Sequence, residues 1–453
     1  MNETARLAEF VTDTQYSDLP TEVIEKAKLL MLDQLGCQLA FATLPWCKDV
    51  YQYVLNNKIG KQESTVVCYG LKVSAEDAAF ANAVFGHGFE MDDTELSTAS
   101  HPGVAVIPAA LAVAESLQAD GKDLIAAIVT GYEVLIRVGA ASHTMMNRGF
   151  HTTSVLGPLG AAAAVSKILG LDISQTVNAL AIASSSSGGI AEYTESGGTV
   201  KRVHAGFAAA NGLRAALLAK NGVTGPRTAI EGKKGFCRAY ADSCSFDELT
   251  KDLGQKFEIM FTGTKPYCCC AAQHSAIDAV SAIMQEHRVV PEEIEKIRVR
   301  QKARDVRAIG SIIEPQDIVS AQFSGRFGIA LRLVKGSNGF RDYSEENLSD
   351  KGIGNIVRRI EYEADEELEK ANPSGAPATV RIQLKDGNTY EKTVQFAKGT
   401  VQNCMNRTEL IDKFRELAGI FLMENHIREI IKKMEELEGV KDVRTLMPLL
   451  VFG

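Results

Sequence analysis

Long apolar stretches rich in alanine and glycine dominate the first half of the chain. Four short polar segments interrupt the apolar sequence between residues 86 and 278. Between residues 20 and 225 apolar side chains recur at spacings of three and four, as on one face of an α-helix, with glycines near the segment ends. Small side chains allow such helices to pack closely. The pattern predicts a compact, buried helical bundle, with helices over 104–118, 124–141, 157–169 and 204–221.

The periodicity changes after residue 291. Alternating apolar and polar residues predict strands, and Lys385–Asn388 has the composition of a hairpin turn. A charged stretch at 361–370 is predicted to be helical, and helical periodicity returns after residue 399, at 409–417 and 427–437. The predicted strands cover 294–301, 378–387 and 389–396.

These patterns predict a mainly α protein with two domains. A large all-helical domain is expected from residues 1–262 and 399–453, so that it is discontinuous and includes the C-terminus. A smaller α+β domain, which we call the lid domain, is expected from residues 263–398. A chain of 453 residues is also longer than a single hydrophobic core usually supports.

Composition and charge exclude several classes of partner. The formal net charge is −8 and the pI is about 5.7, which argues against a nucleic-acid or anionic-membrane surface. The first residues contain Glu3 and Glu9 and no apolar signal segment. The apolar runs near 104–114 and 155–165 end before the ~20 residues that a membrane span needs. We therefore expect a cytoplasmic protein that binds neither nucleic acid nor membrane.

The chain contains nine cysteines, an odd number scattered over its length, which favours reduced thiols over a disulfide framework. The consecutive Cys268, Cys269 and Cys270 suggest an iron–sulfur or zinc site as one interpretation. Adjacent cysteines do not easily converge on one metal ion, and the sequence lacks a second pair at two-residue spacing. We favour a wall of small residues beside a pocket, and no metal.

The first polar segment, at 86–103, contains Asp92, Asp93 and His101. A buried polar group without a partner costs roughly 1–3 kcal/mol, so such groups are expected to be paired or functional. Carboxylates beside an imidazole can hold it in one tautomer or keep it protonated. The alternative is structural, because Asp-Asp-Thr is also a good turn or helix N-cap and capping would account for one of the carboxylates.

The other three segments, at 148–154, 197–206 and 264–278, supply further imidazoles and cations. His151 precedes an alanine-rich helix, where a core histidine is the alternative. Lys201 and Arg202 follow two glycines, so a solvent-exposed surface turn is one interpretation of this segment. The small apolar residues that come next favour the other interpretation, in which the segment points toward the protein interior. Lys265 and His274 lie in the last segment.

Together the segments predict a site for an anionic substrate, because cations bind carboxylates and imidazoles move protons. The sequence contains no phosphate-binding glycine loop, nucleophile elbow or zinc-binding His-Glu motif. Proton transfer without a cofactor is therefore the predicted chemistry.

The ordered motifs resemble those of the MmgE/PrpD family over nearly the whole chain. The motifs that carry the resemblance are DDT…HPG (92–103), GFHTTSVLGPLGAAAA (149–164), KRVHAGFAAANGLRAALLAKNGVTGP (201–226), TKPYCCCAAQH (264–274), AQFSGRFGIA (321–330) and KGTVQN (398–403). The resemblance implies a helical domain with a smaller α+β lid, a homodimer, and no metal or organic cofactor.

The resemblance also implies roles for individual residues. Asp93, His101, His151, Lys201 and His274 form the expected catalytic set, and Asp92, Arg202 and Lys265 are the expected substrate-binding residues. In this scheme Asp93 orients or charges a neighbouring imidazole, and His101 and His151 transfer protons. The sequence does not decide which of these two is the acid.

Four positions depart from the family pattern. Glu90 stands where the family often has aspartate, and Cys268, Val401 and Cys404 stand where it often has proline. The departures leave the proton-transfer residues in place. They leave the identity of the carboxylate substrate open.

The reactions of the family share a step in which negative charge develops on a carbon next to a carboxylate, and preorganised cations stabilise such charge. We expect a lyase for a small di- or tricarboxylate, with dehydration of a 2-methylcitrate-like substrate slightly ahead of cis-aconitate decarboxylation. An isomerase resembling iminodisuccinate epimerase and a non-catalytic carboxylate-binding homologue are the alternatives.

Overall fold

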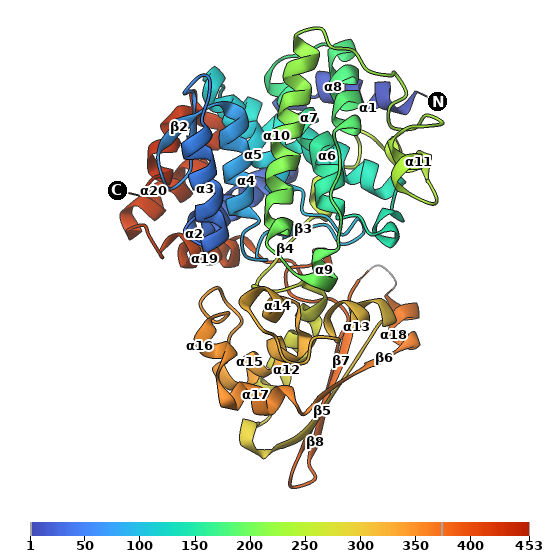
Figure 1. The fold of residues 1–453 in the computed structure, drawn as a ribbon, viewed down its shortest axis with the longest axis vertical. Helices are drawn as coiled ribbons and strands as arrows, with labels where there is room; N and C mark the ends of the chain where they lie inside the picture. Colours follow the sequence, from blue (N-terminus) through green and yellow to red (C-terminus); the bar gives the residue numbers. More distant parts are fainter. Residues whose placement is uncertain (1, 373–374, 453) are drawn as a thin grey trace. The chain divides into compact units, whose positions relative to one another are not determined.

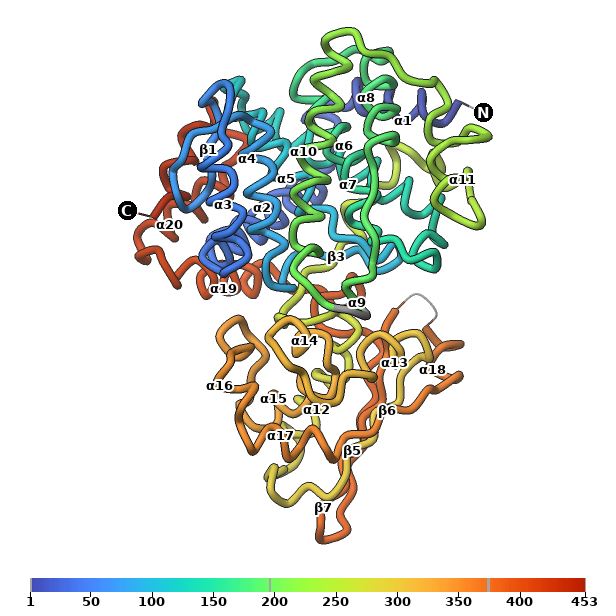
Figure 2. Tube along the Cα trace, in the orientation of Figure 1, coloured from blue at the N-terminus to red at the C-terminus, as the bar shows by residue number. Residues whose placement is uncertain are grey.

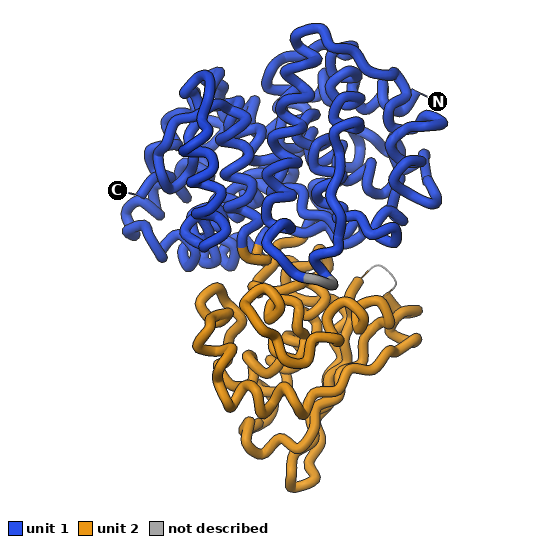
Figure 3. The backbone as a smooth tube through the Cα atoms, in the orientation of Figure 1, with its two compact units in different colours: residues 1–88, 92–262, 406–453 blue, residues 89–91, 263–405 orange. Residues whose placement is uncertain are grey.

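The computed structural model describes residues 2–372 and 375–452, and only the backbone of residues 195 and 196. The chain forms two compact units, which Figure 3 distinguishes by colour. Unit 1 consists of residues 1–88, 92–262 and 406–453, and unit 2 consists of residues 89–91 and 263–405. The chain is mainly helical, as the sequence predicts.

Unit 1 is built from helices of both ends of the chain (Figure 1). Its described α-helices are α1 (Glu3–Asp13), α2 (Thr21–Phe41), α3 (Pro45–Asn57), α4 (Ala75–Gly86), α5 (Gly103–Leu117), α6 (Gly121–Ala141), α7 (Thr152–Ile168), α8 (Ile173–Ser185), α9 (Tyr193–Ser196), α10 (Val200–Lys220), α11 (Phe236–Tyr240), α19 (Arg407–Ala418) and α20 (Glu424–Glu435).

The centre of unit 1 is the alanine-rich helix α7, which packs against α5, α6, α8 and α10. Ala161, Ala162, Ala163 and Ala164 of α7 are fully buried, so the small residues permit the close packing that the sequence predicts. The four predicted helices of this region are confirmed as α5, α6, α7 and α10. Helices α6, α7 and α10 begin three to five residues earlier than predicted, because their first turns carry polar residues that lack the apolar period, and α5 begins one residue earlier.

Helix α6 has the length and apolar composition of a membrane-spanning helix, although no uninterrupted apolar run of that length was predicted from the sequence. Its most apolar window is 94% buried inside the structure. Helix α6 packs against α7 and α5, so its apolar surface is covered by the core of unit 1. The composition of α6 is therefore accounted for as that of a core helix.

Unit 1 is not entirely helical, which corrects the predicted all-helical domain. Strands β1 (Ser64–Val66) and β2 (Leu71–Val73) form an antiparallel pair, with Ser64 opposite Val73. Strands this short carry no alternating pattern that a sequence search detects. They are fixed by tertiary contacts, since the Glu115 carboxylate of α5 accepts hydrogen bonds from the backbone and the hydroxyl of Thr65.

The C-terminal segment returns to unit 1, where α19 and α20 both pack against α2 (Figure 2). Between α2 and α19, Lys413 Nζ lies 2.6 Å from Asp33 Oδ1, and both side chains are buried. This ion pair joins two helices that are separated by most of the sequence.

Unit 2 contains a four-stranded sheet in the order β6-β5-β7-β8. Strand β5 pairs in parallel with β6 and antiparallel with β7, which pairs antiparallel with β8. Helix α12 packs on β7 and β8, and α15 packs on α12. The elements are β5 (Ile294–Gln301), β6 (Ile360–Ala364), β7 (Ala378–Leu384), β8 (Thr389–Val394), α12 (His274–Glu286), α13 (Ala303–Ile309), α14 (Ile318–Phe323), α15 (Gly325–Lys335), α16 (Glu345–Leu348), α17 (Lys351–Val357) and α18 (Glu366–Ala371).

The three predicted strands and the hairpin turn of unit 2 are confirmed, but the prediction of a helix over 361–370 is wrong in its first half. Residues 360–364 form β6, because pairing with the interior strand β5 of the sheet outweighs the local helical preference. The unit also extends past residue 398. Thr264 donates its backbone N–H to Gly399, and Lys398 donates its own to Asp278 Oδ2, so this segment packs within unit 2.

Candidate active site

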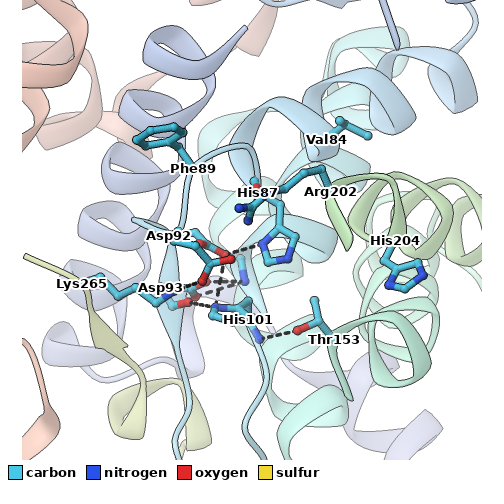
Figure 4. Close-up of polar contacts among 12 residues, drawn as sticks. Val84, His87, Phe89, Asp92, Asp93, His101, Thr153, Arg202, His204 and Lys265 are labelled. Carbon is cyan, nitrogen blue, oxygen red and sulfur yellow. Dashed lines mark hydrogen bonds and ion pairs between the residues drawn. The ribbon is translucent and has the colours of Figure 1, made fainter. Parts of the chain in front are cut away.

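Asp92 brings two imidazoles of unit 1 together (Figure 4). Its Oδ2 atom lies 2.8 Å from His87 Nδ1 and 3.2 Å from His101 Nδ1. The His87 and Asp92 side chains are fully buried, whereas 12% of the His101 side chain is exposed. Helix α4 ends at Gly86, immediately before His87, and His101 lies just before α5.

The hydrogen bonds of His101 determine which of its nitrogens carries a proton. Nδ1 of His101 lies 2.6 Å from the backbone carbonyl oxygen of Asp93. A carbonyl oxygen only accepts hydrogen bonds, so Nδ1 is the donor. In the neutral ring Nε2 then holds the lone pair, and the Asp92 carboxylate stabilises the ring when Nε2 becomes protonated.

His87 is held in the same way by the Asp92 carboxylate. Burial lowers the pKa of His87 well below its usual value, against the opposing effect of Asp92, so the ring is neutral. Its Nδ1 donates to Asp92, which leaves the lone pair on Nε2. Within the described part of the chain, no hydrogen-bond partner reaches this buried Nε2 atom.

Asp93 has a different role from the one that the sequence predicted. Both of its carboxylate oxygens lie 3.1 Å from the backbone nitrogen of Gly103, which donates its N–H, and the Tyr132 hydroxyl donates to Oδ2 at 2.7 Å. A Cβ atom at residue 103 would lie 2.6 Å from the Tyr132 hydroxyl, so only glycine permits this approach. Asp93 therefore holds the start of α5, and Asp92 is the carboxylate that contacts imidazoles. This corrects the predicted imidazole-orienting role of Asp93.

The environment of Asp93 predicts an effect on stability. Burial raises the pKa of Asp93 to about 7, while the usual value is 3.8. The folded state binds this proton more tightly than the unfolded state, so the contribution of Asp93 to stability falls as the pH rises from about 4 to about 7. We expect the Asp93→Asn variant to lack this pH-dependent loss, which amounts to up to about 1.4 kcal/mol of unfolding free energy per pH unit.

Urea unfolding of both proteins between pH 4 and 8 tests this expectation. The difference in unfolding free energy, variant minus wild type, should increase with pH. Glu133, whose pKa burial also raises to about 7, is present in both proteins and cancels in the difference. A difference in unfolding free energy that does not change with pH would show that the pKa of Asp93 is not raised in the folded state.

The loop that carries His101 is held at several points. The Glu95 carboxylate accepts the backbone N–H groups of Ser97 and Thr98 at 3.0 and 2.8 Å. The His101 backbone N–H donates to Thr153 Oγ1 at 3.1 Å, and Thr152 Oγ1 donates to the carbonyl of Ala99. These contacts tie the His101 loop to the first turn of α7, directly after His151.

His151 is the N-cap residue of α7 and is buried, with 6% of the residue exposed. Its ring centroid lies 5.8 Å from that of His87, and its Nδ1 atom lies 3.0 Å from Nδ1 of His204. Burial, together with the neighbouring His87, His204 and His101, lowers the pKa of His151 well below its usual value. The ring is therefore neutral near pH 7.

Lys201 and Arg202 are in the first turn of α10 and are buried, as the sequence predicts. Arg202 Nη1 donates to the carbonyl oxygen of His87 at 3.3 Å, and Lys201 Nζ lies 6.0 Å from the centre of the Tyr193 ring. Cations at a helix N-terminus oppose the helix dipole. The first turn of α10 thus concentrates positive charge, which favours an anion.

The two predicted site residues of the last polar segment lie in unit 2. Lys265 Nζ lies 3.0 Å from Glu90 Oε2, and both side chains are buried. His274 begins α12, as predicted, and its Nε2 lies 3.3 Å from the carbonyl oxygen of Cys269. The ring of Tyr267 meets His274 edge-on at 5.1 Å. Lys265 therefore already has a carboxylate partner of its own chain.

Cys268 and Cys269 are buried and Cys270 is partly exposed. Cys268 Sγ lies 3.2 Å from Met91 Sδ, and burial raises the pKa of Cys269 to about 12. A neutral thiol is a poor metal ligand. The residues with described positions contain no group of three or more His, Cys, Asp or Glu side chains arranged to hold a metal ion.

Unit 1 thus collects Asp92, Asp93, His101, His151, Lys201 and Arg202, while unit 2 contains Lys265 and His274. Two further imidazoles, His87 and His204, lie in the predicted polar segments, but the predicted site did not include them. Tyr132 gave no signal, because it is one polar tip within the apolar helix α6. The arrangement in unit 1 can transfer protons through imidazoles and bind carboxylates through cations.

Comparisons with known proteins agree with this chemistry. The MmgE/PrpD N-terminal domain matches residues 5–249, and the MmgE/PrpD C-terminal domain matches residues 267–437. Cis-aconitate decarboxylase of Aspergillus terreus is 28% identical over 99% of this chain and 95% of its own length. The mouse (Mus musculus) cis-aconitate decarboxylase is 28% identical over 99% and 93%. The mitochondrial 2-methylcitrate dehydratase of Yarrowia lipolytica is 23% identical over 94% and 85%. The chain therefore belongs to the MmgE/PrpD family.

Proposed function

We propose that this protein is a lyase for a small polycarboxylate and that it decarboxylates a cis-aconitate-like substrate without a metal or organic cofactor. The observation that carries the proposal is His101. Asp92 and the Asp93 carbonyl hold its Nδ1–H, so that Nε2 is the atom that gains and loses a proton. The relatives named cis-aconitate decarboxylase match nearly the full chain, which favours decarboxylation over the dehydration that the sequence put slightly ahead.

In the proposed reaction Lys201 and Arg202 bind substrate carboxylates. When the bond to the departing carboxylate breaks, carbon dioxide leaves and the electron pair of that bond forms a new C=C double bond. The electrons of the original double bond move to the carbon next to another carboxylate. The two cations stabilise this charge as it develops. His101, protonated at Nε2 and stabilised by Asp92, donates its proton to that carbon and recovers one from solvent. His274 and Lys265 stay in the proposal through the family resemblance.

Dehydration of a 2-methylcitrate-like substrate is the second candidate, supported by the relatives named 2-methylcitrate dehydratase. This reaction needs a base for one proton and an acid for the departing hydroxyl. His101 and His151 would divide these roles. No observation favours the epimerase or the non-catalytic alternative.

A substrate comparison tests the proposal. Purified protein is incubated with cis-aconitate, 2-methylcitrate, citrate and iminodisuccinate, while carbon dioxide, alkene absorbance and deuterium uptake from solvent are followed. Carbon dioxide release from cis-aconitate is the expected result. Alkene formation from 2-methylcitrate alone would favour the dehydratase, and deuterium exchange without net loss would favour an epimerase.

Two controls belong to this experiment. Activity should survive dialysis against a chelator, because the proposed steps use only side chains of the chain. Loss of activity that returns with added iron would refute the cofactor-free mechanism. Measurable binding without turnover of any of the four compounds would favour a non-catalytic homologue.

We also propose that the protein is a homodimer, as the family resemblance implies, and that it is cytoplasmic, as its sequence leads us to expect. Helix α10 displays exposed apolar side chains at helical spacing, with Phe207 49% and Leu218 39% exposed. Phe207 packs on Phe80 of α4, with ring centroids 5.6 Å apart, so the apolar surface continues onto α4. A second copy of the chain is the proposed occupant of this surface.

Substitution of Phe207 by aspartate tests the proposed dimer. The wild-type protein should have twice the mass of the chain in sedimentation experiments, and the variant should be a monomer with unchanged secondary structure. The matched control is Phe261→Asp, because Phe261 is exposed to a similar degree but lies outside α10. A wild-type monomer would refute the dimer, and a dimeric variant would refute this location.

A further inference from the structure

His204 and His151 face each other with their Nδ1 atoms 3.0 Å apart. His204 is 5% exposed and His151 is 6% exposed, so water does not compete for this contact. Two nitrogens at this distance share one hydrogen, because two N–H groups would repel and two lone pairs would form no bond. One ring is therefore protonated on Nδ1, and the other, when neutral, is protonated on Nε2.

Backbone groups and one aromatic ring pack around the pair. The His151 backbone N–H donates to the carbonyl of Gly189 at 3.1 Å. A Cβ atom at residue 189, where φ is +137°, would lie 2.4 Å from Ser154 Oγ and 3.6 Å from His204 Cδ2, so the backbone at this glycine lies close to the ring of His204. The ring of Tyr193 meets both imidazoles edge-on, at 5.4 Å from His151 and 6.0 Å from His204.

The charges around the pair keep it from binding two protons. Burial lowers the pKa of His204, and Lys201 on the same helix lowers it further. Burial lowers the pKa of His151, as do the neighbouring His87, His204 and His101, and Asp92 opposes them. Tyr193 is a further titratable neighbour, and its ring meets both imidazoles. Two adjacent imidazolium ions would repel, so the pair titrates as one unit.

We propose that His204 is a positioning residue for His151, which it locks in a single tautomer through the shared Nδ1 hydrogen. The lock decides whether Nε2 of His151 offers a proton or a lone pair. The two rings then take up one proton between them where two independent histidines would take up two. This inference rests on the proposed function for its effect on catalysis, but the tautomer itself is independent of any substrate.

Nitrogen NMR of protein with 15N-labelled imidazoles tests the lock directly. We expect one ring of the pair to be protonated on Nδ1 and the other on Nε2, with the signals assigned from His151→Asn and His204→Asn. In His204→Leu, His151 should show exchange between both tautomers. His204→Asn keeps an amide near the position of Nδ1 and should preserve a single tautomer of His151.

Two NMR results would overturn the proposal. Wild-type rings that both carry the proton on Nε2 would exclude the shared hydrogen. A single His151 tautomer that is unchanged in His204→Leu would show that other contacts fix the ring. If His204→Leu does not fold, the wild-type spectrum and the His204→Asn variant still decide.

Kinetics separate this inference from the proposed function. With an active substrate, His204→Leu should lower kcat about tenfold, with a changed pH profile and a KM within about threefold. This is less than the roughly 10²- to 10⁴-fold loss for an acid–base group itself, because His204 acts through His151. His204→Asn should restore most of the rate. The exposed His143 provides the control, and His143→Leu should change neither rate nor profile. The His151→Ala variant could be fully active although the wild-type spectrum shows the shared Nδ1 hydrogen. In that case the proposed catalytic role of His151 is wrong, and the inference about its tautomer is retained.

Discussion

Replacing His101 by asparagine should lower kcat by about 10²- to 10⁴-fold, the range for loss of a general acid or base. The asparagine amide can still donate to the Asp93 carbonyl oxygen, which His101 Nδ1 contacts at 2.6 Å. The loop therefore keeps its anchor, while the atom that transfers the proton is removed. Rates with cis-aconitate and with the other candidate substrates measure the effect.

The Asp92→Asn variant separates charge from shape at the same site. It keeps the size of the side chain but no longer stabilises an imidazolium at His101, so kcat should fall and the pH optimum should shift toward acid. His143→Asn, at an exposed position of unit 1, should leave kcat unchanged. A His101→Asn enzyme could keep kcat/KM within about threefold of wild type, which corresponds to a loss of less than about 1 kcal/mol of transition-state stabilisation. This result would exclude His101 as the proton carrier.

Replacing Lys413 by methionine should lower the free energy of unfolding by about 3–5 kcal/mol at pH 7, the typical cost of leaving a buried charge without its partner. Lys413 Nζ lies 2.6 Å from Asp33 Oδ1, and the two side chains are 3% and 1% exposed. Burial already raises the pKa of Asp33 while Lys413 opposes the rise, so loss of Lys413 raises that pKa further. Urea unfolding measures the change.

The direction of the pH effect identifies the buried charge as the cause. In Lys413→Met the folded state holds a proton on Asp33 more tightly than the unfolded state does, so stability falls as the pH rises above the usual aspartate range. The deficit should shrink toward pH 4. The double variant Asp33→Asn with Lys413→Met should recover much of the loss. An equal deficit at all pH values would instead indicate lost packing.

Much of the helical framework could be predicted from the sequence. Small residues at helical spacing predicted α5, α6, α7 and α10, and alternation predicted β5, β7 and β8. Such signals are local, because each depends on which face of one element is buried. The pair β1 and β2 and the strand β6 depend instead on partners distant in the sequence, and the local pattern missed or misassigned them.

The sequence by itself determined the family, the mainly helical fold and the segments in which the site would lie, because ordered motifs and hydrophobic periodicity are properties of the chain. Only the tertiary structure decided which of two adjacent aspartates contacts imidazoles and which holds the start of α5. Neighbouring residues in an extended segment point in different directions, and the positions of Tyr132, Gly103 and His87 determine what each carboxylate meets. The pairing of His151 with His204 across α7 and α10, and of Asp33 with Lys413 across α2 and α19, likewise follows from helix packing, which residue spacing along the chain does not specify.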